Sequence, residues 1–215
     1  MASNLNTLID IIKDKDTNDA IRWIDSADPD TDFSGFRNDH NETLAQFCVL
    51  PHIDEAPIAR KLITKMDMKS LENRDNDNNT LITSSIYYDG LLNDLLSMGV
   101  NPNTRDADGT TLFAMLAELG FMKTMRRLVE EFNIDISDKT SDSALILSAM
   151  NHKTEVVKYL LSLGVDLEQR FFDSWGKDYL DDLKNYKRLD KYTEMIVKAG
   201  LLELLPDTVK DVFVF

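Results

Sequence analysis

The acidic side chains of this chain fall in groups that could support acid–base chemistry. The grouped carboxylates are Asp28, Asp30 and Asp32, then Asp75 and Asp77, then Asp181 and Asp182. Two carboxyl groups can act as acid and base when burial drives their pKa values apart. All of these groups fall in expected turns or on expected helix surfaces, where water solvates both members. We therefore interpret them as exposed acids and not as catalytic pairs.

Residue types that bind metals or act as nucleophiles are few. The chain has one cysteine, Cys48, and three histidines that lie far apart in sequence. Their spacing matches no zinc site, and the run from Asp75 to Asp77 begins like a calcium loop without its glycine and late glutamate. Cys48 falls on an apolar helix near acidic residues, which favours a buried, unreactive thiol. No metal ion and no cofactor is predicted.

Catalytic sequence motifs are also missing. The sequence contains no HExxH, GxSxG, GxxxxGK[ST] or GxGxxG pattern, so no metalloprotease, nucleophile-elbow, phosphate-loop or dinucleotide-binding site is indicated. The sequence predicts a protein that is not an enzyme.

The charge restricts the class of partner. The chain has 38 acidic and 24 basic residues among 215, a formal net charge of −14. Nucleic-acid backbones and anionic membranes would repel such a surface. No apolar run approaches the roughly 20 residues that span a bilayer, and the N-terminus does not resemble a secretory signal. We expect a cytoplasmic protein, in its own cell or in a host cell if it is an effector, with no direct nucleic-acid or membrane partner.

The elements that must position these side chains repeat along the chain. Residues 143–167 are predicted to form a short helix over 144–150, a turn, and a second helix over 154–163 that stops at Gly164. Similar units open at Thr43, Thr80 and Thr111, so the four openings are 37, 31 and 32 residues apart. A period near 33 predicts an all-α helix–turn–helix solenoid with short turns or hairpins between units.

Further helices complete this stack. Second helices are expected over residues 59–66, 91–99 and 122–132, a leading pair over 5–13 and 17–26, and a last unit over 175–180 and 192–200. We predict a single domain over residues 1–215, with cap helices in 1–37, central repeats in 38–170, and an irregular repeat and cap in 171–215.

Two segments resemble a known repeat family. The run Asp106-Ala-Asp-Gly-Thr-Thr-Leu-Phe-Ala-Met-Leu-Ala-Glu-Leu-Gly120 is similar to the DxxGxTPLHxAxxxG opening of ankyrin repeats, and Glu155-Val-Val-Lys-Tyr-Leu-Leu-Ser-Leu-Gly-Val-Asp166 is similar to their EVVxLLLxxGAD close. The resemblance extends, more loosely, over about five units plus a leading helical cap. The chain departs from the family at its helix-starting proline and at the histidine that ties each turn to its neighbour. Ala114 and Ile146 occupy that histidine position.

The resemblance implies which residues bind a partner. In ankyrin stacks each turn projects as a fingertip, and the first helices line a concave groove. By position, the partner-binding residues are Asp75, Asp77, Arg105, Asp106, Asp108 and Trp175 at fingertips, and Tyr87, Tyr88, Glu118, Leu119, Met150 and Asn151 beside the groove. Aromatic and methionine side chains make good anchors in such grooves. The alternative is that Leu119, Met150 and Trp175 pack within the stack.

Two functions agree with these features. The first is a non-enzymatic protein–protein interaction module whose concave face and acidic turn tips bind, and modulate or inhibit, a partner with a basic or mixed surface. The alternative is an acidic nucleic-acid mimic that occupies the DNA- or RNA-binding groove of an enzyme. We expect a monomer in which the apolar residues 209–215 cover the last unit; the alternative is a dimer through the C-terminal aromatic residues.

Overall fold

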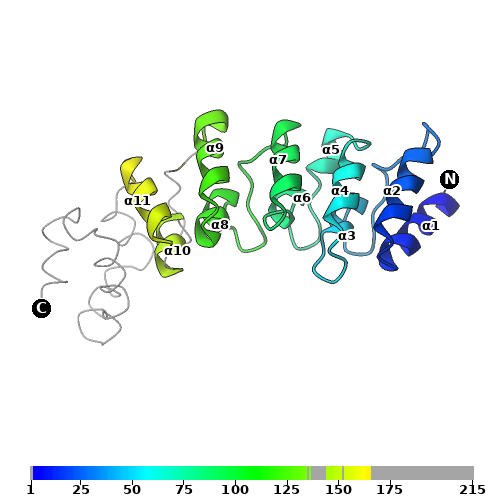
Figure 1. Ribbon diagram of the computed structural model, residues 1–215, viewed down its shortest axis with the longest axis horizontal. Coiled ribbons are helices and arrows are strands. Elements are labelled where there is room, and N and C mark those ends of the chain that lie inside the picture. The colour runs from blue at the N-terminus through cyan, green and yellow to red at the C-terminus, as the bar shows by residue number, and fades with distance from the viewer. Residues whose placement is uncertain (1, 135, 137–143, 152, 166–215) are drawn as a thin grey trace, which may run out of the picture. The chain divides into compact units, whose positions relative to one another are not determined.

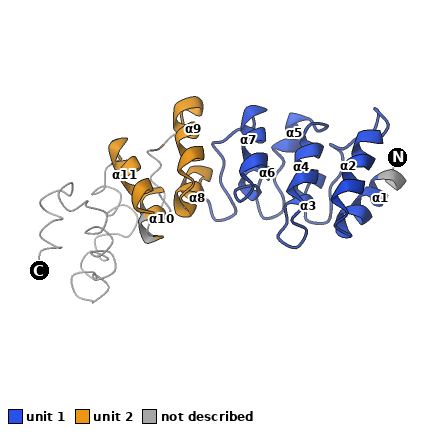
Figure 2. Cartoon of the chain, in the orientation of Figure 1, with its two compact units in different colours: residues 1–109 blue, residues 110–215 orange. Residues whose placement is uncertain are grey.

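The structure is a computed structural model that describes residues 2–134, 136, 144–151 and 153–165 (Figure 1). The chain divides into two compact units, residues 1–109 and 110–215 (Figure 2). Within the described ranges every regular element is a helix, apart from one isolated bridge between Arg74 and Thr80. The predicted all-α class is confirmed. No helix in this part of the chain is long and apolar enough to cross a membrane.

Unit 1 consists of short helices that form pairs, apart from α5. They are α1 (Ala2–Lys13), α2 (Thr17–Ser26), α3 (Leu44–Cys48), α4 (Ala56–Ile63), α5 (Met68–Leu71), α6 (Leu81–Ser84) and α7 (Asp89–Ser97). Helix α4 contacts α2 on one side and α7 on the other, and α3 contacts α6 (Figure 1). The first helices and the second helices of successive pairs therefore lie in two neighbouring rows.

The core of unit 1 lies between these rows. Leu44 of α3, Ile58 and Leu62 of α4, and Leu91 and Leu95 of α7 have no exposed surface. Each short helix buries its apolar stripe against neighbouring pairs, because one pair alone is too small to remove it from water. Stacking is thus the main source of stability, as the repeat pattern predicts.

Unit 2 contains two further pairs, α8 (Leu112–Leu119) with α9 (Met122–Phe132), and α10 (Ala144–Met150) with α11 (Thr154–Ser162). Helix α8 packs against α9 and α10, and α10 packs against α11. The Thr111 hydroxyl caps α8 by accepting the Ala114 N–H at 3.1 Å. Gly120 ends α8 in the left-handed conformation, with φ of 83°.

Several helix boundaries differ from the sequence expectation. Helix α4 begins at Ala56 and not at residue 59, because Pro57 serves as a first-turn proline. Helix α7 begins at Asp89 and not at residue 91, and α5 was not expected. The expected elements over residues 175–200 lie outside the described residues. The single-domain organisation stays a prediction.

Candidate partner-binding surface

Three turns of unit 1 share one backbone design. They span residues 38–41, 75–78 and 106–109, and each ends on a residue with positive φ: Asn41 at 59°, Asn78 at 66° and Gly109 at 84°. Asparagine and glycine are the residues that adopt this left-handed conformation at least cost. The turns therefore form because the chain has a permissive residue at the same position each time.

The first residue of each turn stabilises the turn with its own side chain. The bonded pairs, each at 3.0 Å from backbone N–H to Oδ1, are His40 to Asn38, Asp77 to Asp75, and Asp108 to Asp106. Asp75 Oδ1 also accepts the Asn79 N–H at 2.8 Å. Asp75 and Asp106, two of the predicted partner-binding residues, are half-buried and act within their turns.

An arginine precedes each turn and donates hydrogen bonds to backbone carbonyls. Arg105 donates from Nη1 to the Gly109 carbonyl at 2.8 Å. Arg74 donates from Nη1 to the carbonyls of Asn78 at 2.7 Å and Arg105 at 3.2 Å. Arg105, a further predicted partner-binding residue, thus has a role inside its turn.

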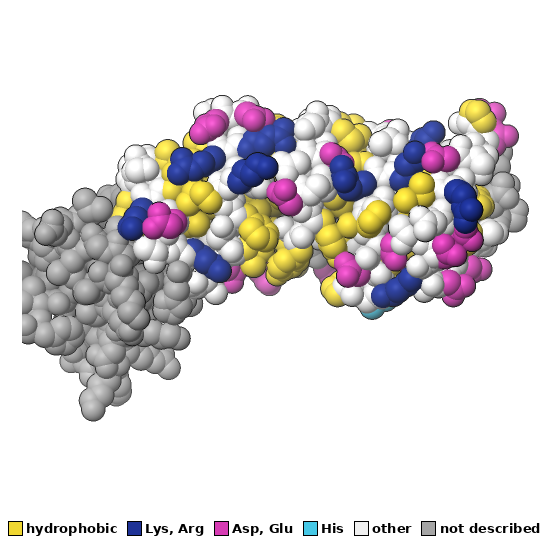
Figure 3. Space-filling model, in the orientation of Figure 1, with side chains coloured by type: hydrophobic (Ala, Val, Ile, Leu, Met, Phe, Trp, Pro, Cys, Tyr) yellow, Lys and Arg dark blue, Asp and Glu magenta, His cyan; other side chains and the backbone are white. Residues whose placement is uncertain are grey.

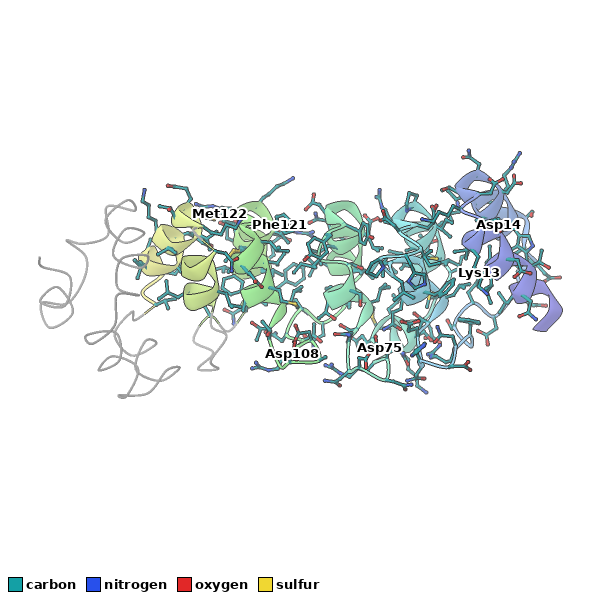
Figure 4. The ribbon with its side chains drawn as sticks, turned by 90° about the horizontal axis from the view of Figure 1, so that it is seen from below. Lys13, Asp14, Asp75, Asp108, Phe121 and Met122 are labelled. Atoms are coloured by element: carbon teal, nitrogen blue, oxygen red, sulfur yellow. The ribbon has the colours of Figure 1, made fainter. Side chains whose placement is uncertain are left out.

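Neighbouring turns are joined to each other. The Asn76 N–H donates to the His40 carbonyl at 2.9 Å, and Asn41 Nδ2 donates to the Arg74 carbonyl at 2.7 Å. The Ala107 N–H donates to Asn79 Oδ1 at 3.2 Å. These bonds hold the three turns in a row, and Asp75 and Asp108 lie along the same edge of unit 1 (Figure 4).

Gln46 takes the place of the histidine that the repeat pattern lacks. Its Oε1 accepts the Thr43 N–H at 2.9 Å, while its Nε2 donates to the carbonyls of Asn79 at 3.2 Å and Asn73 at 3.4 Å. The side chain is buried. The sequence analysis missed this role, although a glutamine three residues after an N-cap threonine is a recognised capping-box pattern.

The outermost acids of the turns remain open to solvent. The acids Asp39, Asp77 and Asp108 are exposed, as is His40, and we call these four residues the tip row. Within the part of the chain that the structure describes, the carboxylates of Asp77 and Asp108 make no hydrogen bond or ion pair. The guanidinium of Arg74, although exposed, and that of half-buried Arg105 are engaged by backbone carbonyls, whereas the tip carboxylates have no such partner.

The turns between paired helices present a different set of side chains. Tyr87 is 71% exposed at the α6–α7 turn. The hydroxyl of Tyr88, which is half-buried, donates to Asp54 Oδ1 at 2.6 Å. Burial, followed by this hydrogen bond and the charge of Asp54, raises the pKa of Tyr88 to about 12. Tyr87 is free to meet a partner, whereas Tyr88 links two repeats.

The corresponding turns of unit 2 place the remaining predicted residues. Asn151 is exposed and donates from Nδ2 to Glu118 Oε1 at 3.3 Å, and Leu119 is half-buried. Phe121, which the sequence analysis did not single out, is 39% exposed. The side chain of Met150 and the whole of Trp175 lie outside the described residues.

The titratable side chains form no metal site among the described residues, where no three His, Cys, Asp or Glu groups come together. Cys48 is buried. Burial, with a smaller contribution from the charge of Glu55, raises the pKa of the Cys48 thiol.

Comparison with known proteins identifies repeats in part of the chain. Residues 81–170 match a family model for ankyrin repeats, present in three copies. These residues, 90 of the 215 in the chain, are similar to ankyrin repeats. The predicted resemblance is therefore confirmed.

Solved structures show the same ankyrin repeat fold. The human ASB11 ankyrin repeat domain is 12% identical with a TM-score of 0.60, covering 96% of this chain and 95% of that one. The ankyrin repeat domain of Bcl-3, a member of the IkappaB family, is 18% identical with a TM-score of 0.59, covering 95% and 96%. The predicted solenoid fold is confirmed by this similarity.

Two spider toxins contain a stretch of sequence similar to this chain. Alpha-latroinsectotoxin-Lt1a of Latrodectus tredecimguttatus is 32% identical over 99 residues, which is 44% of this chain and 7% of the toxin. Alpha-latrocrustotoxin-Lt1a of the same spider is 29% identical over 100 residues, 45% of this chain and 7% of the toxin. This chain matches only about 7% of the length of each of these relatives.

Proposed function

We propose that this ankyrin repeat protein is a non-enzymatic module that binds a protein with a basic or mixed surface through its tip row, and modulates that partner. Ankyrin repeats are generally protein–protein interaction modules and are typically not enzymes, which supports the class of function. The solved relatives support the fold that such a module needs.

The observation that carries the proposal is that the arginines of the turns are hydrogen-bonded while the tip carboxylates are exposed without a partner among the described residues. Arg74 and Arg105 direct guanidinium groups to backbone carbonyls, whereas Asp77 and Asp108 lie exposed at the tips. The turns are also hydrogen-bonded to one another, so binding would not have to order three separate loops. Pre-ordered charges of one sign favour fast, salt-dependent association with a surface of the opposite sign.

The exposed tyrosine offers an apolar anchor on the same unit. Tyr87 has 71% of its surface exposed and is the most exposed large apolar side chain among the described residues. Tyrosine supplies large contact area and a hydroxyl with few rotatable bonds, and it is enriched at binding hot spots. We propose Tyr87, at the α6–α7 turn, as a separate apolar contact and the tip row as the steering charge.

The experiment compares quantitative affinity capture from cell extract by three versions of the chain. They are the natural sequence, Asp77→Lys with Asp108→Lys, and the matched control Asp14→Lys with Asp30→Lys, whose acids are exposed and belong to none of the three turns. A partner retained by the control and lost by the tip variant supports the proposal. A partner retained by all three versions would remove the tip row from the binding surface.

A second experiment with the captured partner distinguishes an interaction module from a nucleic-acid mimic. Surface plasmon resonance with added duplex DNA or RNA measures whether nucleic acid and this chain compete for one groove. Competition would favour the mimic, which needs the tip acids to take the place of phosphates. Simultaneous binding would leave the interaction module as the function.

A further inference from the structure

Unit 2 carries basic side chains that the tip row does not account for. Residues 1–109 hold 20 acidic and 10 basic residues, a formal charge of −10, whereas residues 110–215 hold 18 and 14, a charge of −4. Helix α9 itself has three basic residues, Lys123, Arg126 and Arg127, and two acidic ones. Dark-blue side chains, with magenta ones beside them, lie on the part of the surface that α9 forms (Figure 3).

Arg126 is held in place by stacking and not by an acid. Its Cζ lies 4.4 Å from the centroid of the Tyr159 ring on α11. Arg126 is exposed and Tyr159 is buried, so the guanidinium covers the ring. Stacking of this kind fixes the plane of the guanidinium and leaves N–H donors at its edges. Among the described residues no carboxylate pairs with Arg126.

Lys123 lies one helical turn before Arg126. It is exposed and has no ion pair within the described ranges of the chain. Residues three apart on a helix are neighbours on its surface. Arg127 differs, since its Nε donates to Glu131 at 2.8 Å. The two cations without a carboxylate partner thus lie together, which concentrates positive charge at one place.

Glu130 is the acid that faces this place from α9. Burial raises the pKa of Tyr159, Arg126 lowers it, and Glu130 raises it further, so both charges act on the same ring. Glu130 is exposed and makes no ion pair with Arg126. An acidic ligand at Arg126 would therefore be repelled by Glu130, and this repulsion gives a variant that should strengthen binding.

We propose that Lys123 and Arg126 form a docking surface for a short acidic segment of a partner protein. The edge of the stacked Arg126 guanidinium can bind one carboxylate through two N–H groups, and Lys123 can bind a neighbouring carboxylate. Charge complementarity selects the acid. The remaining charge of the protein selects a short segment. A long polyanion such as nucleic acid would come within the Debye length, about 8 Å, of further acidic side chains and be repelled by them.

The test uses the full chain and a fluorescein-labelled oligoglutamate peptide, with binding followed by fluorescence anisotropy at low salt. Lys123→Glu with Arg126→Glu should weaken binding by about tenfold or more. Glu130→Gln should tighten binding by about twofold. Arg126→Lys keeps the charge but loses the paired N–H donors of the guanidinium. Its affinity for the peptide should lie between that of the natural protein and that of the double Glu variant.

The control is Lys13→Glu with Lys65→Glu, which makes the same change in net charge at two exposed lysines of unit 1. This control should alter binding by less than about twofold. Equal weakening by both double variants would overturn the proposal, since the peptide would then sense net charge only. The side-chain Nε–Hε signal of Arg126, followed by nuclear magnetic resonance in the natural sequence, should shift on peptide addition; an unchanged signal would also overturn it.

Two further results would reassign the surface. An oligonucleotide that displaces the peptide at lower concentration would make it a phosphate site. Self-association in sedimentation experiments that disappears in Lys123→Glu with Arg126→Glu would make a second copy the occupant. Either result overturns an acidic partner segment as the ligand.

Discussion

The Tyr88 hydroxyl donates a hydrogen bond of 2.6 Å to Oδ1 of Asp54, and this bond joins the α6–α7 turn to the α3–α4 turn. The two residues are 34 positions apart, about one repeat. The bond therefore links neighbouring repeats at the turns between paired helices, as the hydrogen bonds between turns link them at the tips. Burial of Tyr88, followed by this bond and the charge of Asp54, raises its pKa to about 12.

Tyr88→Phe should lower the free energy of unfolding by about 1 kcal/mol at neutral pH, because Asp54 loses a hydrogen-bond donor. The natural protein should lose this advantage as the pH rises from the ordinary tyrosine value of 10.0 to about 12. The sign follows from the raised pKa: the folded state holds the proton more tightly, so ionisation favours unfolding. Urea unfolding of both proteins across this pH range measures the effect.

The two proteins should differ least at the alkaline end of that range. Asp54→Asn is the companion variant, since an amide oxygen can still accept the hydroxyl proton without the charge. It should retain more stability than Tyr88→Phe. A constant stability difference between Tyr88→Phe and the natural protein at every pH would contradict the assignment.

Gln46 gives a second prediction, because its amide must both accept and donate. Gln46→Glu should destabilise the protein by roughly 2–4 kcal/mol, since a buried carboxylate would face the carbonyls of Asn73 and Asn79 without a proton to donate. Gln46→His should cost less than about 1 kcal/mol, because a neutral imidazole has one acceptor and one donor nitrogen. Thermal and urea unfolding of the three proteins provide the comparison.

The ordering of these two variants is the informative result. If Gln46→His destabilised as much as Gln46→Glu, shape and not hydrogen bonding would govern the position. Gln46→Leu serves as the control of similar size, and it should fall between the two because it leaves the carbonyls unpaired but buries no charge.

The sequence was sufficient to predict the repeats but not which acid of a turn bonds within it and which is exposed. Period and apolar pattern predicted α2, α9 and α10 with their observed limits. Asp75 and Asp77 have the same side chain, and only the backbone path shows that the first closes the turn while the second is exposed. The same holds for Asp106 and Asp108. Two aspartates of one turn thus differ in role, because the turn directs a carboxylate oxygen of the first aspartate to backbone N–H groups and leaves the second aspartate exposed.

Gly120 supports a third prediction about unit 2. Gly120→Ala should cost about 1–2 kcal/mol, because φ of 83° is strained for a residue with a Cβ atom. The new Cβ would lie 3.1 Å from Cδ of Lys153, a flexible side chain that can move aside. Backbone conformation, and not crowding, therefore dominates the cost. The midpoint of urea unfolding is the measurement.

Gly120→Asn is the matched control for that prediction. Asn133 ends α9 with φ of 47°, so this chain already uses asparagine in the left-handed conformation at a helix end. Asparagine should therefore cost less than alanine at position 120. Equal costs would show that contact with Lys153, and not φ, limits the position.

Cys48 leads to the last prediction, on reactivity. Its thiol is buried in α3 and its pKa is raised, first by burial and then by the charge of Glu55. Only the thiolate reacts readily with disulfide reagents, and both access and ionisation are disfavoured here. The folded protein should therefore show almost no reaction with Ellman's reagent at mildly alkaline pH, whereas urea should release one thiol per chain. The rate in the folded state should follow the opening of the α3–α4 pair, so Gln46→Glu should speed labelling more than Gly120→Ala, which changes the other unit.

Rapid, complete labelling of the folded natural protein would contradict a buried thiol. Equal acceleration by the two variants would show that labelling requires the whole chain to unfold.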